Sequence, residues 1–345
     1  MSSVTASAAL PPLRFRIGRH QGVIVAIVVF AVLMGINAVM SNGGLTYFDV
    51  SSLATGGAPL AIAATGQTLV ILTGGFDLSA GAVISLVNAV LATQMQDDPA
   101  SIVVWALLGV GVGMLTGAFN GVFIAFLRLQ PIVVTLSTMF IVQGVTLLVM
   151  DKPGGMIPAG LSNALAQDAI PNLVPMALVL IAILMLLWLW VKSTRFGTGI
   201  YAIGSDMEAA RARGINVARV QFMVYVLAGG CYGFSGVFVS AQTGAGDPLV
   251  GNSMLLQIFG AVVVGGTRLG GGRGGCFGSV IGAYILMVVV NILLVLNVSA
   301  YFSTIVEGCI LILAVLASAI TRDSVAARHL RKAFVRFNAW RNGML

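Results

Sequence analysis

The chain has 345 residues, of which 58% are hydrophobic and only 8% are charged. Soluble domains carry about a quarter charged residues, so this composition excludes a soluble globule and indicates a membrane protein. A net charge of +7 would be compatible with binding to nucleic acid or anionic lipid. The distribution of the basic residues along the chain is instead explained by membrane topology, so no nucleic-acid partner is expected.

Apolar stretches long enough to cross about 30 Å of hydrocarbon recur along the whole chain. Continuous runs of about 20 apolar residues predict an all-α polytopic membrane protein and not a transmembrane β-barrel, whose strands alternate in polarity. The first run lacks a small-x-small cleavage site, so we interpret it as a retained span. Ten spans are predicted, at residues 22–40, 53–73, 79–95, 101–127, 132–150, 173–191, 218–242, 253–266, 276–296 and 301–320. The eighth is too short to cross alone, and we expect irregular glycine-rich backbone to extend it.

The basic residues predict which ends of the spans face the cytoplasm. With the N-terminus inside, the inner segments hold every Lys and Arg except Lys152, with Arg219 at a span end. The outer loops collect acidic residues instead, namely Asp49, Asp97, Asp98, Asp151, Asp168 and Asp247. This asymmetry follows the positive-inside rule and predicts an N-in, C-in chain. Ten spans in this arrangement fit a five-plus-five inverted repeat, which is common among transporters.

This topology divides the chain into a cytoplasmic segment at 1–21, a transmembrane domain at 22–320 with an inner loop at 192–217, and a cytoplasmic tail at 321–345. We expect the basic tail to lie as an amphipathic helix on anionic membrane lipid. The outer segment 151–172 is rich in Pro, Gly, Asn and Ser. It is either a simple connection or a surface for a partner outside the membrane.

Two glycine patterns stand out. The fourth span carries Gly109, Gly113, Gly117 and Gly121 along one face, a small-xxx-small ridge that predicts close helix packing. The segment ILTGGFDLSAG at 71–81 is also weakly similar to VVVGGTRLGGG at 262–272, mainly through glycine. We give this second similarity little weight.

Several catalytic signatures are missing from the sequence. There is no GxxxxGK[ST] phosphate loop, so we do not expect this chain to hydrolyse ATP. The only histidines are His20 and His329, outside the spans, and the three cysteines are isolated in apolar segments. We therefore expect no enzyme activity, no metal site and no cofactor in this chain.

Neutral polar side chains interrupt the apolar runs, and polar groups in spans tend to face the bundle interior or a wet path. These candidates for a solute path are Gln67, Asn88, Asn120, Gln143 and Asn291. Amides suit a neutral polyol, although each of them is equally explained by a hydrogen bond between helices. Asp77 either lines the path or caps the helix that begins near Ser79, and we favour the cap. Phe140 and Phe259 are candidates for stacking on a sugar ring.

The segment from Lys192 to Arg219 is the one long polar island between spans. It contains a short helix-forming run, EAARARG (Glu208–Gly214), with Ser205 or Asp206 as candidate N-caps and Gly214 as a stop. Acids near its start and arginines near its end suit the helix dipole. Three alanines, at 209, 210 and 212, would permit close approach to a partner.

The run Glu208-Ala209-Ala210, followed by Gly214, resembles the EAAxxxG coupling loop of importer permeases that are driven by ATP-binding-cassette subunits. RFGTGIYAIGSDMEAARARGINVARVQ resembles the corresponding loop of the ribose/xylose/arabinose/galactose-type permease family. Three more segments resemble that family in the right order: GQTLVILTGGFDLSAGAVISL (66–86), NGVFIAFLRLQPIVVTLSTMFIVQG (120–144) and IFGAVVVGGTRLGGGRGGCFGSVIGA (258–283).

The resemblance implies a permease subunit in the inner (cytoplasmic) membrane that translocates a monosaccharide or similar polyol. Its implied partners are an ATPase subunit, which binds ATP-Mg, a periplasmic sugar-binding protein, and a second permease chain, identical or not. The residues implied to couple to the ATPase are Glu208, Ala209, Ala210, Arg211 and Gly214.

Two alternatives remain open at this point. The first is a permease for another solute, such as a branched-chain amino acid or a sugar-derived signal. The second is a proton-coupled carrier that needs no partner, for which Glu307 in the last span is the one candidate carboxylate.

Overall fold

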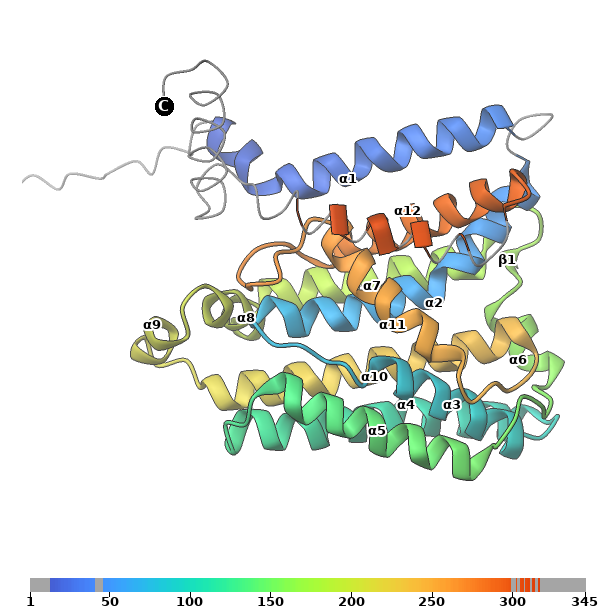
Figure 1. Ribbon diagram of the computed structural model, residues 1–345, viewed down its shortest axis with the longest axis horizontal. Helices are drawn as coiled ribbons and strands as arrows, with labels where there is room; N and C mark the ends of the chain where they lie inside the picture. The colour runs from blue at the N-terminus through green and yellow to red at the C-terminus, as the bar shows by residue number, and fades with distance from the viewer. Residues whose placement is uncertain are drawn as a thin grey trace, which may run out of the picture.

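The computed structural model describes residues 13–40, 46–298 and scattered positions between 302 and 316. Helices make up most of this part of the chain, as Figure 1 shows. The helices are α1 (Leu13–Met40), α2 (Tyr47–Leu72), α3 (Ala80–Gln94), α4 (Pro99–Gly121), the π-helix η1 (Val122–Phe126), α5 (Pro131–Val149), α6 (Ala159–Leu165), α7 (Met176–Ser193), α8 (Arg195–Ser205), α9 (Met207–Ala212), α10 (Val217–Thr243), α11 (Val250–Val264) and α12 (Cys276–Val295). Two short antiparallel strands, β1 (Asp168–Ile170) and β2 (Val174–Pro175), form the one described sheet.

Among the described residues, seven helices are long and apolar enough to cross a membrane: α1 from Gly22, α2, α4 extended by η1, α5, α7, α10 and α12. The all-α polytopic membrane fold is therefore confirmed. The predicted third and eighth spans correspond to α3 and α11, which have 15 residues each. At 1.5 Å per residue each is about 22 Å long, shorter than the hydrocarbon core. The predicted tenth span, 301–320, lies largely outside the described residues.

The helix starts follow local sequence signals. Thr46 and Asp49 form a reciprocal capping box at the start of α2. The Asp98 carboxylate caps α4 by accepting from the Ser101 N–H at 2.9 Å, and a proline follows it at the first helical position. α5 likewise begins at a proline, Pro131.

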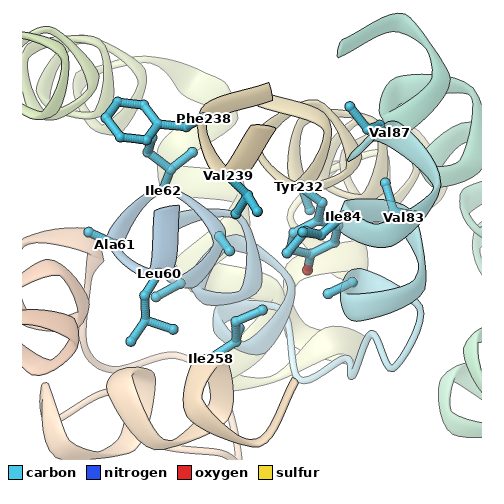
Figure 2. Close-up of a cluster of buried hydrophobic side chains, with 14 of the residues drawn as sticks. Leu60, Ala61, Ile62, Val83, Ile84, Val87, Tyr232, Phe238, Val239 and Ile258 are labelled. Carbon is cyan, nitrogen blue, oxygen red and sulfur yellow. The ribbon is translucent and has the colours of Figure 1, made fainter. Parts of the chain in front are cut away.

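The centre of the fold is occupied by α2 and α10. In the most apolar 18-residue stretch of each helix, 89% of the α2 stretch and 61% of the α10 stretch are buried. The other long helices surround them and are much less buried, at 11–44%. Figure 2 shows the core where four helices meet, with Ile62 of α2 beside Phe238 of α10, Ile84 of α3 beside Tyr232 of α10, and Ile258 contributed by α11. Small residues fill much of the adjoining sequence of α2, so neighbouring backbones approach it closely.

The predicted glycine ridge of α4 packs against α10, as expected. A Cβ atom added at Gly113 would lie 2.2 Å from the carbonyl oxygen of Gly229, and one at Gly117 would lie 2.1 Å from that of Tyr225. On α10, a Cβ at Gly229 would lie 2.1 Å from the Gly113 oxygen. The two backbones are therefore in direct contact, and no larger residue fits at this crossing.

The two ends of the bundle differ. One end, here called the coupling end, carries α8 and α9, and the other, the hairpin end, carries α6, β1 and β2 (Figure 1). The predicted outer segment 151–172 is thus partly folded and not a plain connection. Asp168 of β1 ties it to α2 because its carboxylate accepts from the Tyr47 hydroxyl at 2.5 Å. The other carboxylate oxygen of Asp168 accepts from the Asn172 N–H at 3.0 Å.

We expect Gly113→Leu to destabilise the fold by about 3 kcal/mol, because the side chain overpacks the backbone of α10. The check is thermal unfolding of the purified chain in detergent. Gly111→Leu is the matched control, since a Cβ at Gly111 has no atom within 4 Å. Equal unfolding temperatures for the two variants would contradict the packing assignment.

We expect the hairpin end to loosen in Asp168→Asn at neutral pH. Hydrogen bonds from Tyr47, and then from the Asn172 N–H, hold the pKa of Asp168 below its ordinary value of 3.8. A lowered folded pKa means that this link contributes stability above pH 3.8 and loses it as the pH falls through the folded value. Limited proteolysis within 168–175 should be unchanged for the wild type between pH 8 and 5, and faster for the variant throughout. Asp151→Asn, at the same end, should match the wild type.

Candidate functional sites

The polar island forms two short helices at the coupling end. Thr194 caps α8 by accepting from the Gly197 N–H at 3.2 Å. Asp206, one of the two predicted N-caps, caps α9 by accepting from the Ala209 N–H at 3.0 Å. The chain leaves α9 through Gly214, whose φ of 82° favours glycine and confirms the predicted stop. The sequence therefore determines both ends of this small helix.

The predicted coupling residues divide between the surface and the interior. Glu208 is 80% exposed and pairs with the Arg211 guanidinium at 3.0 Å, and Ala209 and Gly214 are also exposed. Ala210 differs, because it is 3% exposed and packs in a small cluster with Ile203 and Val217. The alanines thus do not form one docking face: Ala210 holds α9 against α8 and α10, while Ala209 faces outward.

The polar island from Lys192 to Arg219, here called the coupling segment, is in contact with two distant glycine-rich segments at the end of α8. A Cβ at Gly204 of α8 would lie 1.8 Å from the Leu72 carbonyl oxygen and 2.5 Å from the Gly272 nitrogen. The Gly272 N–H also donates to the Leu72 carbonyl at 3.0 Å. Leu72 and Gly272 belong to the two segments, 71–81 and 262–272, whose similarity seemed unimportant in the sequence. The fold brings them together beneath α8.

A cavity of about 640 Å³ lies beside α9 at the coupling end. It is bounded by the turn between α4 and α5, by α9 and by the start of α10. Arg128 and Arg211 supply its charged lining, and Tyr225 and Gln221 supply polar groups from α10. Arg128 takes a left-handed backbone conformation, with a φ of 56°. This cavity and the exposed part of α9 give the coupling end a basic, concave surface.

Four of the predicted path residues make hydrogen bonds between helices. Gln67 accepts from the Tyr232 hydroxyl at 2.7 Å, and the Asn88 amide donates to Ser240 at 2.9 Å. The Asn291 amide donates to Asn37 at 3.3 Å. The remaining contacts are those of Asn120, which donates to the Ser79 hydroxyl at 3.0 Å and accepts from Thr138 at 2.6 Å. The structure thus gives these four side chains a role in joining helices.

Asp77 is fully buried in the segment before α3. One carboxylate oxygen accepts from the Ser79 N–H at 2.9 Å and from its hydroxyl at 2.6 Å. These bonds close the turn before α3, and the first turn of the helix itself has no side-chain cap. Its other oxygen has no hydrogen-bond partner among the described residues. Through Ser79 and Asn120, Asp77 is connected by side-chain hydrogen bonds to Thr138 on α5.

Gln143 is the predicted path residue that lines a cavity. This cavity, here called the α3–α11 cavity, has a volume of about 230 Å³ and is lined by Gly81, Ala82, Met139, Phe140, Gln143, Asn252 and Leu255. Phe140 is 65% exposed beside it. Phe259, the other predicted stacking residue, lies instead against Phe76, with ring centroids 6.1 Å apart.

The cavity lies where α3 and α11 begin. A Cβ at Gly81 would lie 2.4 Å from the Gly251 carbonyl oxygen, so the first turns of these two short helices touch. The contact is inside the bundle, between the coupling end and the hairpin end (Figure 1). Asn252 was missed from the sequence because the predicted span began one residue after it. The sequence signal that could have identified Asn252 is a polar residue in the first turn of an apolar helix that is too short to span the membrane.

Residues 49–315 match the family model described as the branched-chain amino acid transport system / permease component. The chain belongs to this family.

Several curated proteins that are similar to this chain are named as sugar import permeases. The Escherichia coli (strain K12) ribose import permease protein is 33% identical over 297 residues, covering 84% of this chain and 92% of the relative. The Bacillus subtilis (strain 168) ribose import permease protein is 34% identical over 73% of this chain and 79% of its own. The Salmonella typhimurium (strain LT2) galactose/methyl galactoside import permease protein is 32% identical over 84% and 91%. No solved structure matches.

We expect Gly204→Val to loosen the coupling segment of this permease component, because its side chain would collide with the backbone at Leu72 and Gly272. Hydrogen–deuterium exchange in residues 195–213 should become about tenfold faster or more. Gly270→Val is the control, because a Cβ at Gly270 meets nothing within 4 Å. Unchanged exchange in Gly204→Val would show that this contact does not hold α8 in place.

Proposed function

We propose that the chain is the membrane permease subunit of an ATP-binding-cassette importer that moves a monosaccharide or similar polyol across the inner (cytoplasmic) membrane. The observation that carries this proposal is the similarity to ribose and galactose import permeases over 84% of the chain. The family description names branched-chain amino acids, so a solute of that class is the second candidate.

In this proposal the energy comes from a separate ATPase subunit, which binds ATP-Mg. The sequence has no phosphate loop of its own, and α9 projects from the coupling end with Glu208, Ala209 and Arg211 exposed. These side chains and Gly214 form the contact surface for the ATPase. Ala210 acts indirectly, since it is buried and positions α9.

The proposed orientation places the coupling end in the cytoplasm. Among the described residues outside the long helices, that end carries Arg195, Arg211, Arg213, Arg268 and Arg273. The hairpin end carries the acidic residues Asp97, Asp98, Asp151, Asp168 and Asp247. The positive-inside rule then supports an N-in chain, with the hairpin end toward a sugar-binding protein outside.

The proposed ten-span, five-plus-five inverted repeat is supported by matching helix orders. α2, α3 and α4 have 26, 15 and 23 residues, and α10, α11 and α12 have 27, 15 and 20. α4 packs on α10 as α12 packs on α2, and α2 and α10 pack on each other. In an N-in chain the two triplets run in opposite directions across the membrane, as an inverted repeat requires.

The coupling step is proposed to pass through Gly204. When the ATPase moves α9, α8 pushes on Leu72 and Gly272, with which it is in contact. Leu72 leads through a short segment into α3, and Gly272 lies in the segment that follows α11. Movement of the coupling segment would therefore shift both half-length helices, which begin side by side in the bundle, and alternate access between them.

A second permease chain is supported by polar groups on the bundle surface. Asn252 is exposed in the first turn of α11, beside the exposed ring of Phe140. Lipid does not satisfy an amide at membrane depth, so this surface requires a protein or a wet path to cover it. We propose that a wet solute path runs over this surface and that the second chain closes the path on its far side. Glu307, the candidate carboxylate of the proton-coupled carrier, lies outside the described residues.

The test of the coupling surface is ATP-driven uptake with the ATPase and binding protein present. We expect Glu208→Lys and Ala209→Asp to leave the chain folded in the membrane but to reduce uptake at least tenfold, because each places an unmatched charge on the docking surface. Asp97→Lys is the control, since it makes a similar charge reversal at the hairpin end.

Co-purification of the ATPase should fall in parallel for the two α9 variants and not for Asp97→Lys. Normal uptake and normal ATPase association in both α9 variants would refute the assignment of this segment.

A further inference from the structure

We propose that the α3–α11 cavity is the solute site and that it selects a neutral polyhydroxylated ring over a zwitterionic amino acid. This inference rests on the proposed function, because it names the solute class of the same permease. It also decides between the sugar named by the relatives and the branched-chain amino acid named by the family description.

Gln143 supplies an unused hydrogen-bond acceptor. Its Nε2 donates to the Pro248 carbonyl at 3.0 Å, which fixes the orientation of the amide. Its Oε1 is buried and has no partner among the described residues. A buried acceptor without a donor costs about 1–3 kcal/mol, and a ligand hydroxyl would remove that cost.

The first turns of α3 and α11 supply backbone surface of the complementary kind. The first N–H groups of a helix have no partner within the helix and carry a partial positive charge. Gly81 and Ala82, in the first turn of α3, line the cavity with at most a methyl group, so little side-chain volume separates the cavity from the start of this helix. On α11, the Gly251 N–H is already bonded to the Ser85 hydroxyl at 2.9 Å, which leaves the Asn252 amide as the polar group in the cavity.

Phe140 supplies an apolar face on the same cavity. Its ring is 65% exposed and Met139 lies next to it in the lining. A sugar ring offers C–H groups on one face and hydroxyl groups around its edge. An aromatic ring on one wall, with two amides and small residues on the others, fits that distribution.

The lining contains no charged side chain. An α-amino acid carries an ammonium and a carboxylate, and burying either away from water is costly unless an opposite charge pairs with it. The positive helix starts give some support to a carboxylate, but no lining group pairs with the ammonium. A hydroxylated neutral ring meets neither penalty, so the cavity selects against the zwitterion.

The test uses the purified full-length chain in nanodiscs and measures saturation-transfer NMR of D-ribose, D-galactose and L-leucine. We expect a sugar signal and no leucine signal for the wild type. Gln143→Leu and Asn252→Leu should each weaken sugar affinity about fivefold, the loss expected for one hydrogen bond. Gln94→Leu is the matched control, because it makes the same change at the exposed end of α3.

The outcomes separate this site from the proposed function. Sugar signals that are absent, or that are unchanged in both cavity variants, would overturn the site even if the assembled importer takes up sugar. Leucine binding in place of the sugars would overturn the selectivity. Absence of ATP-driven sugar uptake by the wild type with its partners would instead refute the proposed function itself.

Discussion

The fold depends on glycine backbones that touch where helices cross. Inside a bilayer, apolar side chains gain little from leaving lipid, so helices associate through close packing and hydrogen bonds. Gly113 against Gly229 joins α4 to α10, and Gly81 against Gly251 joins α3 to α11. At each point an added Cβ would lie within about 2.4 Å of a carbonyl oxygen, so the backbones themselves are the contact surfaces. Larger residues would separate the helices and open the core.

This close packing makes two half-length helices possible. α3 and α11 are too short to span the hydrocarbon alone, so each requires a non-helical connection at depth. Non-helical backbone is tolerated at this depth only where it is buried in protein or lines a water-filled cavity. Asp77, Ser79 and Asn120 satisfy part of the connection before α3 through side-chain hydrogen bonds. The first turns of α3 and α11 line the α3–α11 cavity.

The same geometry relates the two functional regions. Gly204 touches the end of α2 and the segment after α11, and these lead to α3 and α11, which line the α3–α11 cavity together with α5. A displacement of the coupling segment would reach the proposed solute site through a short series of backbone contacts. Side-chain bonds between other helices, such as Gln67 to Tyr232, hold the surrounding bundle together.

The sequence by itself determined the membrane class, most of the helices, the caps and stop of α9, and the glycine ridge of α4. These features are local, because hydrophobic length, capping residues and four-residue spacing act within a few turns. Only the tertiary structure decided which polar side chains line a cavity. Gln143 and Asn291 look alike in the sequence, yet one lines the α3–α11 cavity and the other bonds to Asn37. That difference depends on neighbours more than a hundred residues away, as does the contact between Leu72 and Gly272. Long-range packing leaves no local pattern, which is the physical reason that the sequence did not show it.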